Sequence, residues 1–452
     1  MTVFTHSQEQ LQQIAEDVLR FAKEIGASEA AVQISEGSGL SVSVRKGAVE
    51  TIEQNKDKGI GVTVHLGEAR HIRRGNASTS DFSRQSLKDA VEAAYNIARF
   101  TAEDDCAGLP DKDTLEMEPR DLQLFYPWVV ASEEAVEIAR QTEAAAFAVD
   151  KRVTNSEGAS VHAQQSHFVA ANSHGFMGGY PYSRHSISVA PIAGKGANMQ
   201  RDHWYSSARD PRRLADPEAI GRYAAQRALA RLNARKLDTR KCPVLFEAPL
   251  ATGLLGSFVQ AVSGGALYRK STFLLDSLNR QVFAPHIQVT EDPLIVGGVG
   301  SAPFDEEGVT TQRRDVVRDG IVRGYFLSTY SARKLGMKTT GNSGGSHNLA
   351  LTSLLTVSAD DFEAMLKKLD TGLLVTELMG QGVNYVTGDY SRGASGFWVQ
   401  NGVIQYPVEE ITIAGNLKDM FQQIVAVGAD TLVRGTRETG SILIESMTVA
   451  GA

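Results

Sequence analysis

Cysteine is scarce in this sequence, which has only Cys106 and Cys242 among 452 residues. Two cysteines cannot form the framework of several disulfides that holds small secreted proteins together. No apolar run approaches the roughly 20 residues that a helix needs to cross a bilayer. The first residues, MTVFTHSQEQLQQ, lack a basic segment followed by an apolar one, so no secretory signal is expected. These absences predict a cytoplasmic protein without a membrane partner.

The sequence also lacks an excess of positive charge. Its formal net charge is −7, whereas a protein that binds nucleic acid needs a basic surface, so direct nucleic-acid binding is not expected. The densest basic run, residues 70–74, alternates with the period of a strand and should be a solvent-facing strand face. Proline is sparse, with 13 residues against 42 glycines, which favours tight turns between strands over long linkers.

The first hundred residues show helix and strand periodicity in turn. Ser7 and Gln10 match a capping box ahead of an amphipathic helix that should end near Gly26. A second helix should span residues 84–100. Alternating apolar residues predict strands within residues 40–66.

Turn signals separate these strands, at Lys46-Gly47 and again at Lys58-Gly59. Residues 106–130 hold three prolines and no clear period, so they should form a connector. Residues 131–235 then repeat the helix–strand–helix order of the first block.

From Cys242 onward the pattern indicates many short strands. A buried strand over 244–246 should lead into a helix over 250–262. Asp319-Gly320 and Asn401-Gly402 are strong signals for two-residue hairpins. This part should form a sandwich or a barrel with a few helices.

The predicted fold class is therefore α+β. A chain of 452 residues exceeds the roughly 250–300 that one hydrophobic core usually serves. We expect two N-terminal segments in which helices cover an antiparallel sheet, over residues 1–110 and 118–236. A large β-rich C-terminal domain should follow over residues 240–452.

The histidines give no sign of a metal site. None of the ten stands at i, i+4 from another on a helix, and the sequence has no HExxH motif. His162 and His167 are close in sequence, but their odd spacing in a strand would put them on opposite faces. The acidic run 305–307 before Gly308 lacks further oxygen ligands at a regular spacing. Ordinary surface or core positions are expected for these residues.

Nucleophile and phosphate motifs are missing as well. The run 393–396 reads GASG rather than the G-x-S-x-G elbow of hydrolases. Ser391 and Asp389 could form a triad only if the fold brought His347 to them. The glycine-rich run 341–346 lacks the Gly-Lys-Ser/Thr ending of a phosphate loop and should be a flexible surface loop. No residue of the chain is expected to be catalytic.

One stretch, residues 383–415, combines features that suggest recognition. It contains the charged pair Asp389 and Arg392, five aromatic residues and several glycines. Glycines let a partner backbone approach closely, and aromatic residues give it a surface to pack on. The stretch is a candidate peptide-binding edge or subunit interface, although a hairpin packed on its own sheet fits equally well. The candidate residues are Asp389, Tyr390, Ser391, Arg392, Phe397 and Trp398.

The same stretch carries a family resemblance. The run GDYSRGASGFWVQNGVIQYPVEEITIAGNLKDMF, residues 388–421, resembles the C-terminal signature of the TldD/PmbA family. The resemblance covers almost the whole chain and is closest to the PmbA branch. Five further runs agree with it: VRKGAVETIE (44–53), NSHGF (172–176), GGALYRKSTFLLDSL (264–278), FDEEGV (304–309) and SARKLG (331–336).

This resemblance implies a two-part cytoplasmic peptidase. In the family, the TldD-type subunit holds zinc with an HExxxH motif on a helix and a cysteine near its C-terminus. The family is linked to maturation of a ribosomally made peptide antibiotic and to antitoxin turnover. An older name links it to modulation of DNA gyrase.

The zinc motif itself is not kept. On the helix after strand 244–246, the resemblance places its first histidine, its glutamate and its second histidine at Gly256, Ser257 and Ala261. Thr439 stands where the cysteine is expected. A catalytic zinc site needs three protein ligands and a bound water. No metal or other cofactor is therefore expected in this chain, and zinc is expected in the TldD-type partner.

The resemblance thus implies the non-catalytic subunit of a heterodimeric metallopeptidase that cleaves unfolded peptides. Its expected partners are a TldD-type subunit and the peptide, and a homodimer of the isolated chain stays open. One alternative is an active metal-dependent peptidase with an unrecognised site. The other is a modulator of DNA gyrase that acts by protein–protein contact.

Overall fold

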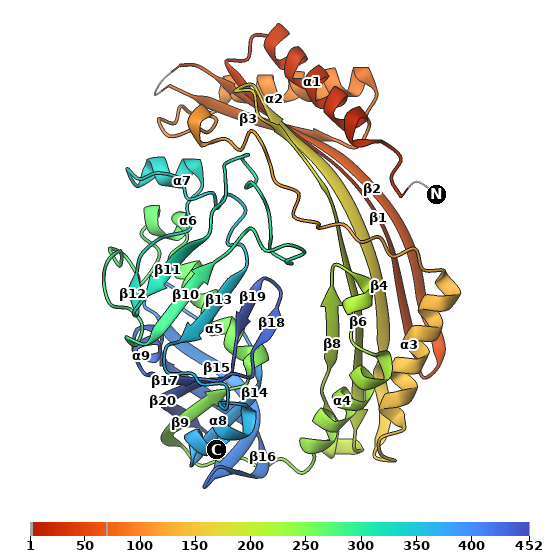
Figure 1. Cartoon of the computed structure of the whole chain (residues 1–452), viewed down its shortest axis with the longest axis vertical. Coiled ribbons are helices and arrows are strands. Elements are labelled where there is room, and N and C mark those ends of the chain that lie inside the picture. The colour runs from red at the N-terminus through yellow and green to blue at the C-terminus, as the bar shows by residue number, and fades with distance from the viewer. Residues whose placement is uncertain (1–2, 69–70, 452) are drawn as a thin grey trace. The chain divides into compact units, whose positions relative to one another are not determined.

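The computed structural model describes residues 3–68 and 71–451. The chain divides into two compact units, and each is described by itself (Figure 1). The first unit contains residues 1–229 and 295–311, and the second contains residues 230–294 and 312–452. Residues 295–311 are therefore an insertion in the sequence of the second unit that packs within the first.

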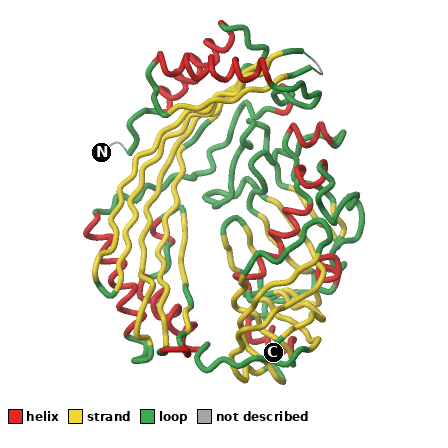
Figure 2. The backbone as a smooth tube through the Cα atoms, turned by 180° about the vertical axis from the view of Figure 1, so that it is seen from behind, coloured by secondary structure: helices red, strands yellow, loops and turns green. Residues whose placement is uncertain are grey.

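One long antiparallel sheet runs through the first unit (Figures 1 and 2). Its strand order is β3-β2-β1-β4-β6-β7, with β5 paired to β4 and β8 paired to β6. The strands predicted for two N-terminal segments share this sheet, because β1 pairs with β2 on one side and β4 on the other. The strands are β1 Glu29–Arg45, β2 Ala48–Leu66, β3 Arg73–Thr79, β4 Val153–Asn172, β5 Met177–Gly178, β6 Pro181–Ala193, β7 Gln200–Arg201 and β8 Trp204–Ala208.

The predicted helices cover this sheet. The first helix begins at the predicted capping box, in which the Ser7 hydroxyl accepts from the Gln10 amide and the Gln10 side chain accepts from the Ser7 amide. It buries Leu11, Ala15 and Val18 against the sheet, and full burial of a leucine or valine contributes about 1.5–3 kcal/mol. The helices are α1 Gln8–Glu24, α2 Arg84–Phe100, α3 Ser132–Phe147 and α4 Pro217–Ala230, with single 3₁₀ turns at Lys112–Thr114, Gly196–Asn198 and Pro211–Arg213.

One of the two predicted turns in this region is confirmed. Lys46 and Gly47 join β1 to β2 with φ angles of 50° and 73°. The predicted turn at Lys58-Gly59 is wrong, because both residues lie inside β2 and pair with residues 35–36 of β1. A long partner strand keeps them extended, which their local sequence does not reveal. Residues 106–130 form the predicted connector, with one 3₁₀ turn and an isolated bridge in it.

The second unit is β-rich, as predicted, and contains two sheets. One has the order β12-β11-β10-β13-β19-β18, and the other has the order β16-β15-β14-β9-β20-β17. In the latter, β16 also pairs with β20, which closes part of the sheet into a ring. The strands are β9 Arg240–Phe246, β10 Ile287–Glu291, β11 Arg314–Arg318, β12 Ile321–Val322, β13 Leu349–Ser353, β14 Gly372–Met379, β15 Asp389–Gln400, β16 Val403–Asn416, β17 Ile424–Val427, β18 Leu432–Arg434, β19 Arg437–Thr439 and β20 Ile442–Ala450.

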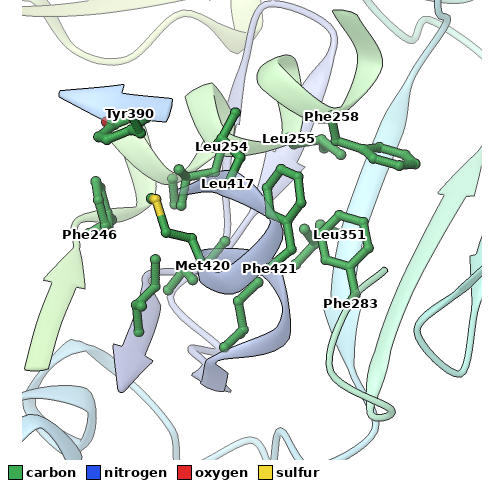
Figure 3. Packing of buried hydrophobic residues seen from close by; sticks show 14 of the residues in the cluster. Phe246, Leu254, Leu255, Phe258, Phe283, Leu351, Tyr390, Leu417, Met420 and Phe421 are labelled. Atoms are coloured by element: carbon green, nitrogen blue, oxygen red, sulfur yellow. The ribbon is translucent and has the colours of Figure 1, made fainter. Parts of the chain in front are cut away.

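Helix α5 lies in the main core of this unit (Figure 3). Leu254, Leu255 and Phe258 of α5 pack in one apolar cluster with Phe283 and Phe421. A helix that is apolar on most sides is a buried helix, as observed here. The helices are α5 Ala248–Ala261, α6 Gly264–Tyr268, α7 Thr329–Lys334, α8 Phe362–Leu369 and α9 Leu417–Gln422.

Both predicted hairpin turns of the second unit are confirmed. Asp319 and Gly320 join β11 to β12 with φ angles of 54° and 73°. Asn401 and Gly402 join β15 to β16 with φ angles of 52° and 72°. Two successive positive φ angles are the signature of the turn that suits twisted antiparallel strands. Among the helices of the described residues, none is long and apolar enough to cross a membrane.

Candidate functional site

Helix α5 carries the three positions at which the zinc motif was expected. It follows β9 directly and has Pro249 in its first turn, where the missing N–H of proline leaves no helical hydrogen bond unmade. Leu255 and Phe258 anchor α5 in the core. Another side of the helix contacts β18 and β19. The apolar core and the strands β18 and β19 therefore form the surroundings of Gly256, Ser257 and Ala261.

These three positions do not fit a zinc ion. Gly256 and Ala261 have no donor atom. The Ser257 hydroxyl donates to the carbonyl oxygen of Gly253 at 3.2 Å, a bond within the helix itself. Ala261 is fully buried among apolar residues. Because a catalytic zinc needs three protein ligands, the donor set of α5 cannot supply the site.

The guanidinium of Arg437, on β19, lies over Gly256. A Cβ atom at Gly256 would stand 2.8 Å from Nη1 of Arg437 and 3.1 Å from its Cζ. Burial lowers the pKa of Arg437, and Tyr385 opposes this effect. Within residues 3–68 and 71–451, Nε of Arg437 is a buried donor without a hydrogen-bond partner. A positive group therefore occupies the space beside the first expected ligand position.

Thr439 stands two residues further along β19, where the resemblance expects a cysteine. Its side chain is buried, and its hydroxyl has no hydrogen-bond partner within the described part of the chain. Residues two apart in a strand share a face, so Thr439 is on the same side of β19 as Arg437. A hydroxyl replaces a thiolate here, which removes the soft, anionic ligand that zinc favours.

Residues 389–392 alternate between the core and solvent. Tyr390 is buried in the core of the second unit (Figure 3). Burial raises the pKa of Tyr390 to about 12, although Arg392 opposes the shift by its charge and a hydrogen bond. Arg392 is half-buried, and its Nε has no partner among the residues that the structure describes. Asp389 and Ser391 are exposed on the other face of β15.

Strand β15 is not a sheet edge. It pairs with β14 on one side and with β16 on the other. A peptide that adds to a sheet needs free backbone groups at an edge, so binding here would have to use side chains. Phe397 packs against the cluster around α8, and the guanidinium of Arg240 lies 5.0 Å from the ring centre of Trp398. The binding or interface role of the six candidate residues stays a prediction.

The structure contains a buried polar cluster that the sequence did not reveal. Glu291, at the end of β10, accepts from Nε of Arg314 at 2.7 Å, from the Asn342 amide at 2.8 Å and from the His347 ring at 3.0 Å. Burial alone would raise the pKa of Glu291, but the His347 hydrogen bond and the Arg314 charge lower it to about 2. The segment 341–346 is a loop with Gly344 and Gly345 at the surface, as predicted, but its Asn342 is buried and tied to Glu291.

The structure does not bring together the triad considered for Ser391. The His347 ring nitrogen that faces Glu291 is engaged there. Asp389 accepts from the Thr387 hydroxyl at 2.6 Å and from the Asn416 amide at 3.1 Å. No hydrogen bond joins Ser391, Asp389 and His347 in the described residues.

Two other candidates have structural explanations. Asp305 accepts from the backbone N–H groups of Glu307 and Val309, both at 2.9 Å, and so caps a turn. In the basic run, Arg73 pairs with exposed Glu103 at 2.9 Å, as expected for a solvent-facing strand. Arg70 lies outside the described residues.

The first unit has two features without a sequence signal. A cavity of about 750 Å³ is lined by the connector segment 119–126 together with His6, His167 and Tyr180. Residues 104–106 each bring one potential ligand atom within 4.8 Å of the others. Exposed acidic groups commonly cluster in this way without an ion. Neither the cavity nor this cluster includes a residue of α5.

Three family models match consecutive parts of the chain. The PmbA/TldA metallopeptidase domain 1 matches residues 30–98, the central domain matches residues 125–232, and the C-terminal domain matches residues 239–451. The chain belongs to the PmbA/TldD metallopeptidase family. The whole candidate site on α5 and β19 lies within the match to the C-terminal PmbA/TldA domain.

Curated relatives place the chain in the PmbA branch. It is 48% identical to Metalloprotease PmbA of Escherichia coli O157:H7 over 441 residues, which cover 97% of this chain and 96% of the relative. It is 45% identical to a PmbA homolog of Haemophilus influenzae, covering 100% and 98%. A TldD homolog from the same Haemophilus influenzae strain is 23% identical, covering 82% and 79%.

Solved structures of the PmbA/TldD type share the fold. A proposed modulator of DNA gyrase from Bacteroides thetaiotaomicron has a TM-score of 0.91 at 26% identity, covering 99% of this chain and 100% of that one. A protein similarly described from Thermotoga maritima has a TM-score of 0.86 at 26% identity, covering 97% and 100%. TldE from Thermococcus kodakarensis, at 21% identity and a TM-score of 0.82, shares the fold and covers 97% and 100%.

Proposed function

We propose that this chain is the non-catalytic subunit of a heterodimeric metallopeptidase and pairs with a TldD-type subunit that holds the zinc. The observation that carries the proposal is the chemistry of α5 in a chain that matches the PmbA branch along its whole length. The side chains of Gly256 and Ala261 offer no metal ligand, and the positive charge of Arg437 lies beside Gly256. Like charges repel strongly where water is partly excluded, so this position disfavours a zinc ion further.

The relatives support a two-part assembly. Haemophilus influenzae has both a PmbA homolog and a TldD homolog that resemble this chain along most of their lengths. Two chains that share one architecture can pair through equivalent faces, much as the subunits of a symmetric dimer do. A homodimer of this chain in isolation would use the same kind of interface, and the mass of the isolated chain in solution would reveal it.

The proposed substrate is an unfolded peptide. Asp389, Ser391 and Trp398 offer an exposed acid, an exposed hydroxyl and a half-buried aromatic ring on β15, which side chains of a peptide or of the partner subunit could contact. The proposed location is the cytoplasm. The chain has only two cysteines, and both are buried, as suits a reducing compartment.

Reconstitution tests the proposal. The chain and a TldD-type subunit are purified separately, then mixed, and the cleavage of a fluorescent unstructured peptide is measured for each sample. A variant of the TldD-type subunit with its motif glutamate replaced by glutamine is the matched control. Cleavage should require the intact TldD-type subunit and should increase with this chain up to a 1:1 ratio. Cleavage by this chain alone, with stoichiometric zinc, would show instead that it is an active peptidase.

A second candidate function is modulation of DNA gyrase through protein–protein contact. The two structural relatives described as proposed gyrase modulators are the observation in its favour. A pull-down with the purified chain and purified gyrase, without a TldD-type subunit, tests it. Retention of gyrase at equal stoichiometry would support this function, and gyrase in the flow-through would contradict it.

A further inference from the structure

Arg437 and Arg392 are half-buried, and they differ from Arg314 and Arg231 of the second unit in having no acidic partner. Arg314 pairs with Glu291 at 2.7 Å, and Arg231 pairs with Glu377. Neither Arg437 nor Arg392 has an ion pair with a carboxylate of the described residues, and Nε of each is buried without a hydrogen-bond partner. A partly desolvated guanidinium without a counter-ion is costly to a folded protein.

Gly256 provides the space in which the Arg437 guanidinium lies. The nearest atoms to a Cβ built on Gly256 all belong to that guanidinium, at 2.8, 3.1 and 3.5 Å. Any larger residue at position 256 would push the Arg437 side chain away. The missing side chain of Gly256 on α5 therefore leaves room for the Arg437 guanidinium from β19 to pack against the helix.

A tyrosine accompanies each arginine. Tyr390 forms a hydrogen bond with Arg392, and Tyr385 partly offsets the lowering of the Arg437 pKa by burial. A tyrosine hydroxyl can donate to an anion as well as accept from an arginine. These arginine and tyrosine side chains provide several hydrogen-bond donors, and within the described residues no acidic group forms an ion pair with either arginine.

We infer that Arg437 binds a carboxylate group of the peptide beside Gly256, where the family resemblance places the first ligand of the zinc motif. The inference rests on the proposed peptide-handling function and specifies the chemistry of its ligand. The planar guanidinium matches a carboxylate with two parallel hydrogen bonds, which a lysine cannot form. The carboxylate comes either from the C-terminus of a peptide or from an aspartate or glutamate side chain.

Peptide binding to the full chain tests this inference. Fluorescein-labelled unstructured peptides of one sequence are compared by anisotropy in three forms. The first has a free C-terminal acid and no acidic side chain, the second has a C-terminal amide, and the third has the amide and one internal glutamate. Wild-type protein should bind the first or the third at least tenfold more tightly than the second, and whichever is favoured identifies the source of the carboxylate.

Variants show whether Arg437 is responsible. Arg437→Gln and Arg437→Lys should each weaken binding of the favoured acidic peptide about tenfold, which equals 1.4 kcal/mol, and bring it to the level of the amide. Gly256→Ala should weaken it as well, because it displaces the guanidinium while keeping the charge. Arg280→Gln, which removes an exposed charge from the same unit, is the matched control and should bind as wild type does.

The outcomes separate this inference from the proposed function. Equal binding of all three peptides by wild type, or unchanged acid preference in Arg437→Gln, would overturn the inference, and so would no binding to the chain or its heterodimer. Peptide cleavage by the reconstituted heterodimer does not depend on that preference, so the proposed function would stand. Thermal unfolding of each variant checks that its fold is intact, and Arg437→Lys keeps the charge if Arg437→Gln is unstable.

Discussion

The carboxylate of Glu291 accepts a hydrogen bond from Nε of Arg314 at 2.7 Å, with Glu291 fully buried. Glu291 ends β10, which pairs with β13, and β13 pairs in turn with β19, the strand of Arg437. The same carboxylate binds Asn342 and His347. This pair therefore stabilises the sheet that places Arg437 over α5.

Replacing Glu291 should destabilise the second unit strongly. Glu291→Gln removes the negative charge and leaves the Arg314 guanidinium without its partner, which for buried pairs costs about 3–5 kcal/mol. The free energy of unfolding in urea, followed by fluorescence, measures the effect. Glu445→Gln changes an exposed carboxylate on β20 and should stay within about 0.5 kcal/mol of wild type. Equal stability of both variants would contradict this role of Glu291.

Acid should weaken the first unit before the second. Burial lowers the pKa of His162, His167 and His185, so the unfolded chain binds protons near pH 6.5 that the folded unit does not. The contribution of these neutral histidines to the stability of the first unit is therefore complete above about pH 6.5. It is lost as the pH falls toward the lower pKa values that the histidines have in the folded unit. Glu291 has a folded pKa of about 2, so its contribution is complete above roughly pH 4.3 and is lost as the pH falls toward 2.

Tryptophan fluorescence can separate the two units. The chain has three tryptophans, of which Trp128 and Trp204 are in the first unit and Trp398 is in the second. Trp398→Phe reports the first unit, and the double variant Trp128→Phe with Trp204→Phe reports the second. Between pH 7.5 and 5.5, the urea midpoint should fall in the first variant and stay level in the second. A larger fall in the second would show that these histidines do not control acid stability.

Two glycines of β15 should respond differently to alanine. A Cβ on Gly396 would come within 1.8 Å of the backbone oxygen of Leu374, which cannot move without breaking the pairing with β14. A Cβ on Gly393 would meet only atoms of Met379, the nearest at 3.4 Å, which is an ordinary van der Waals distance. Gly396→Ala should therefore destabilise the unit by about 1–3 kcal/mol or more, and Gly393→Ala by much less. Thermal unfolding of both variants measures this, and similar melting temperatures would count against the close approach.

Ser391→Ala should leave peptide hydrolysis by the reconstituted heterodimer within about twofold of wild type, since removing a true nucleophile costs orders of magnitude. Ser391 is exposed, and His347 is engaged with Glu291 instead. Initial rates at saturating peptide provide the measurement, with Ser395→Ala on the buried face as a comparison. A loss of more than a hundredfold in Ser391→Ala alone would revive the nucleophile hypothesis.

Local signals predicted the elements of the fold well. The capping box at Ser7 and Gln10, the hairpins at Asp319-Gly320 and Asn401-Gly402 and the helix over 84–100 depend on residues close in sequence, and all are observed. The turn predicted at Lys58-Gly59 is wrong because residues of β1 far along the hairpin hold these residues extended. Pairing between β1 and β4, which unites the first unit in one sheet, joins segments more than a hundred residues apart.

The candidate site also combines features that the sequence predicts with features that depend on distant contacts. The missing ligands at Gly256, Ser257 and Ala261 could be found from the family pattern, because each is a substitution within one helix. Arg437 could not, because its role depends on the packing of α5 against β19 across some 180 residues of sequence. Gly256 stands where the resemblance expects a metal-binding side chain. This glycine is the signal that could have suggested that a side chain from another segment fills the space.

The most direct test of the central claim, that this chain has lost its own metal site, is its zinc content. The purified chain is loaded with excess zinc, passed through a desalting column and analysed by mass spectrometry, alone and after assembly with a TldD-type subunit. Far less than one zinc per isolated chain is predicted, and about one per heterodimer, because only the partner supplies three ligands. One zinc retained by the isolated wild-type chain would contradict the account.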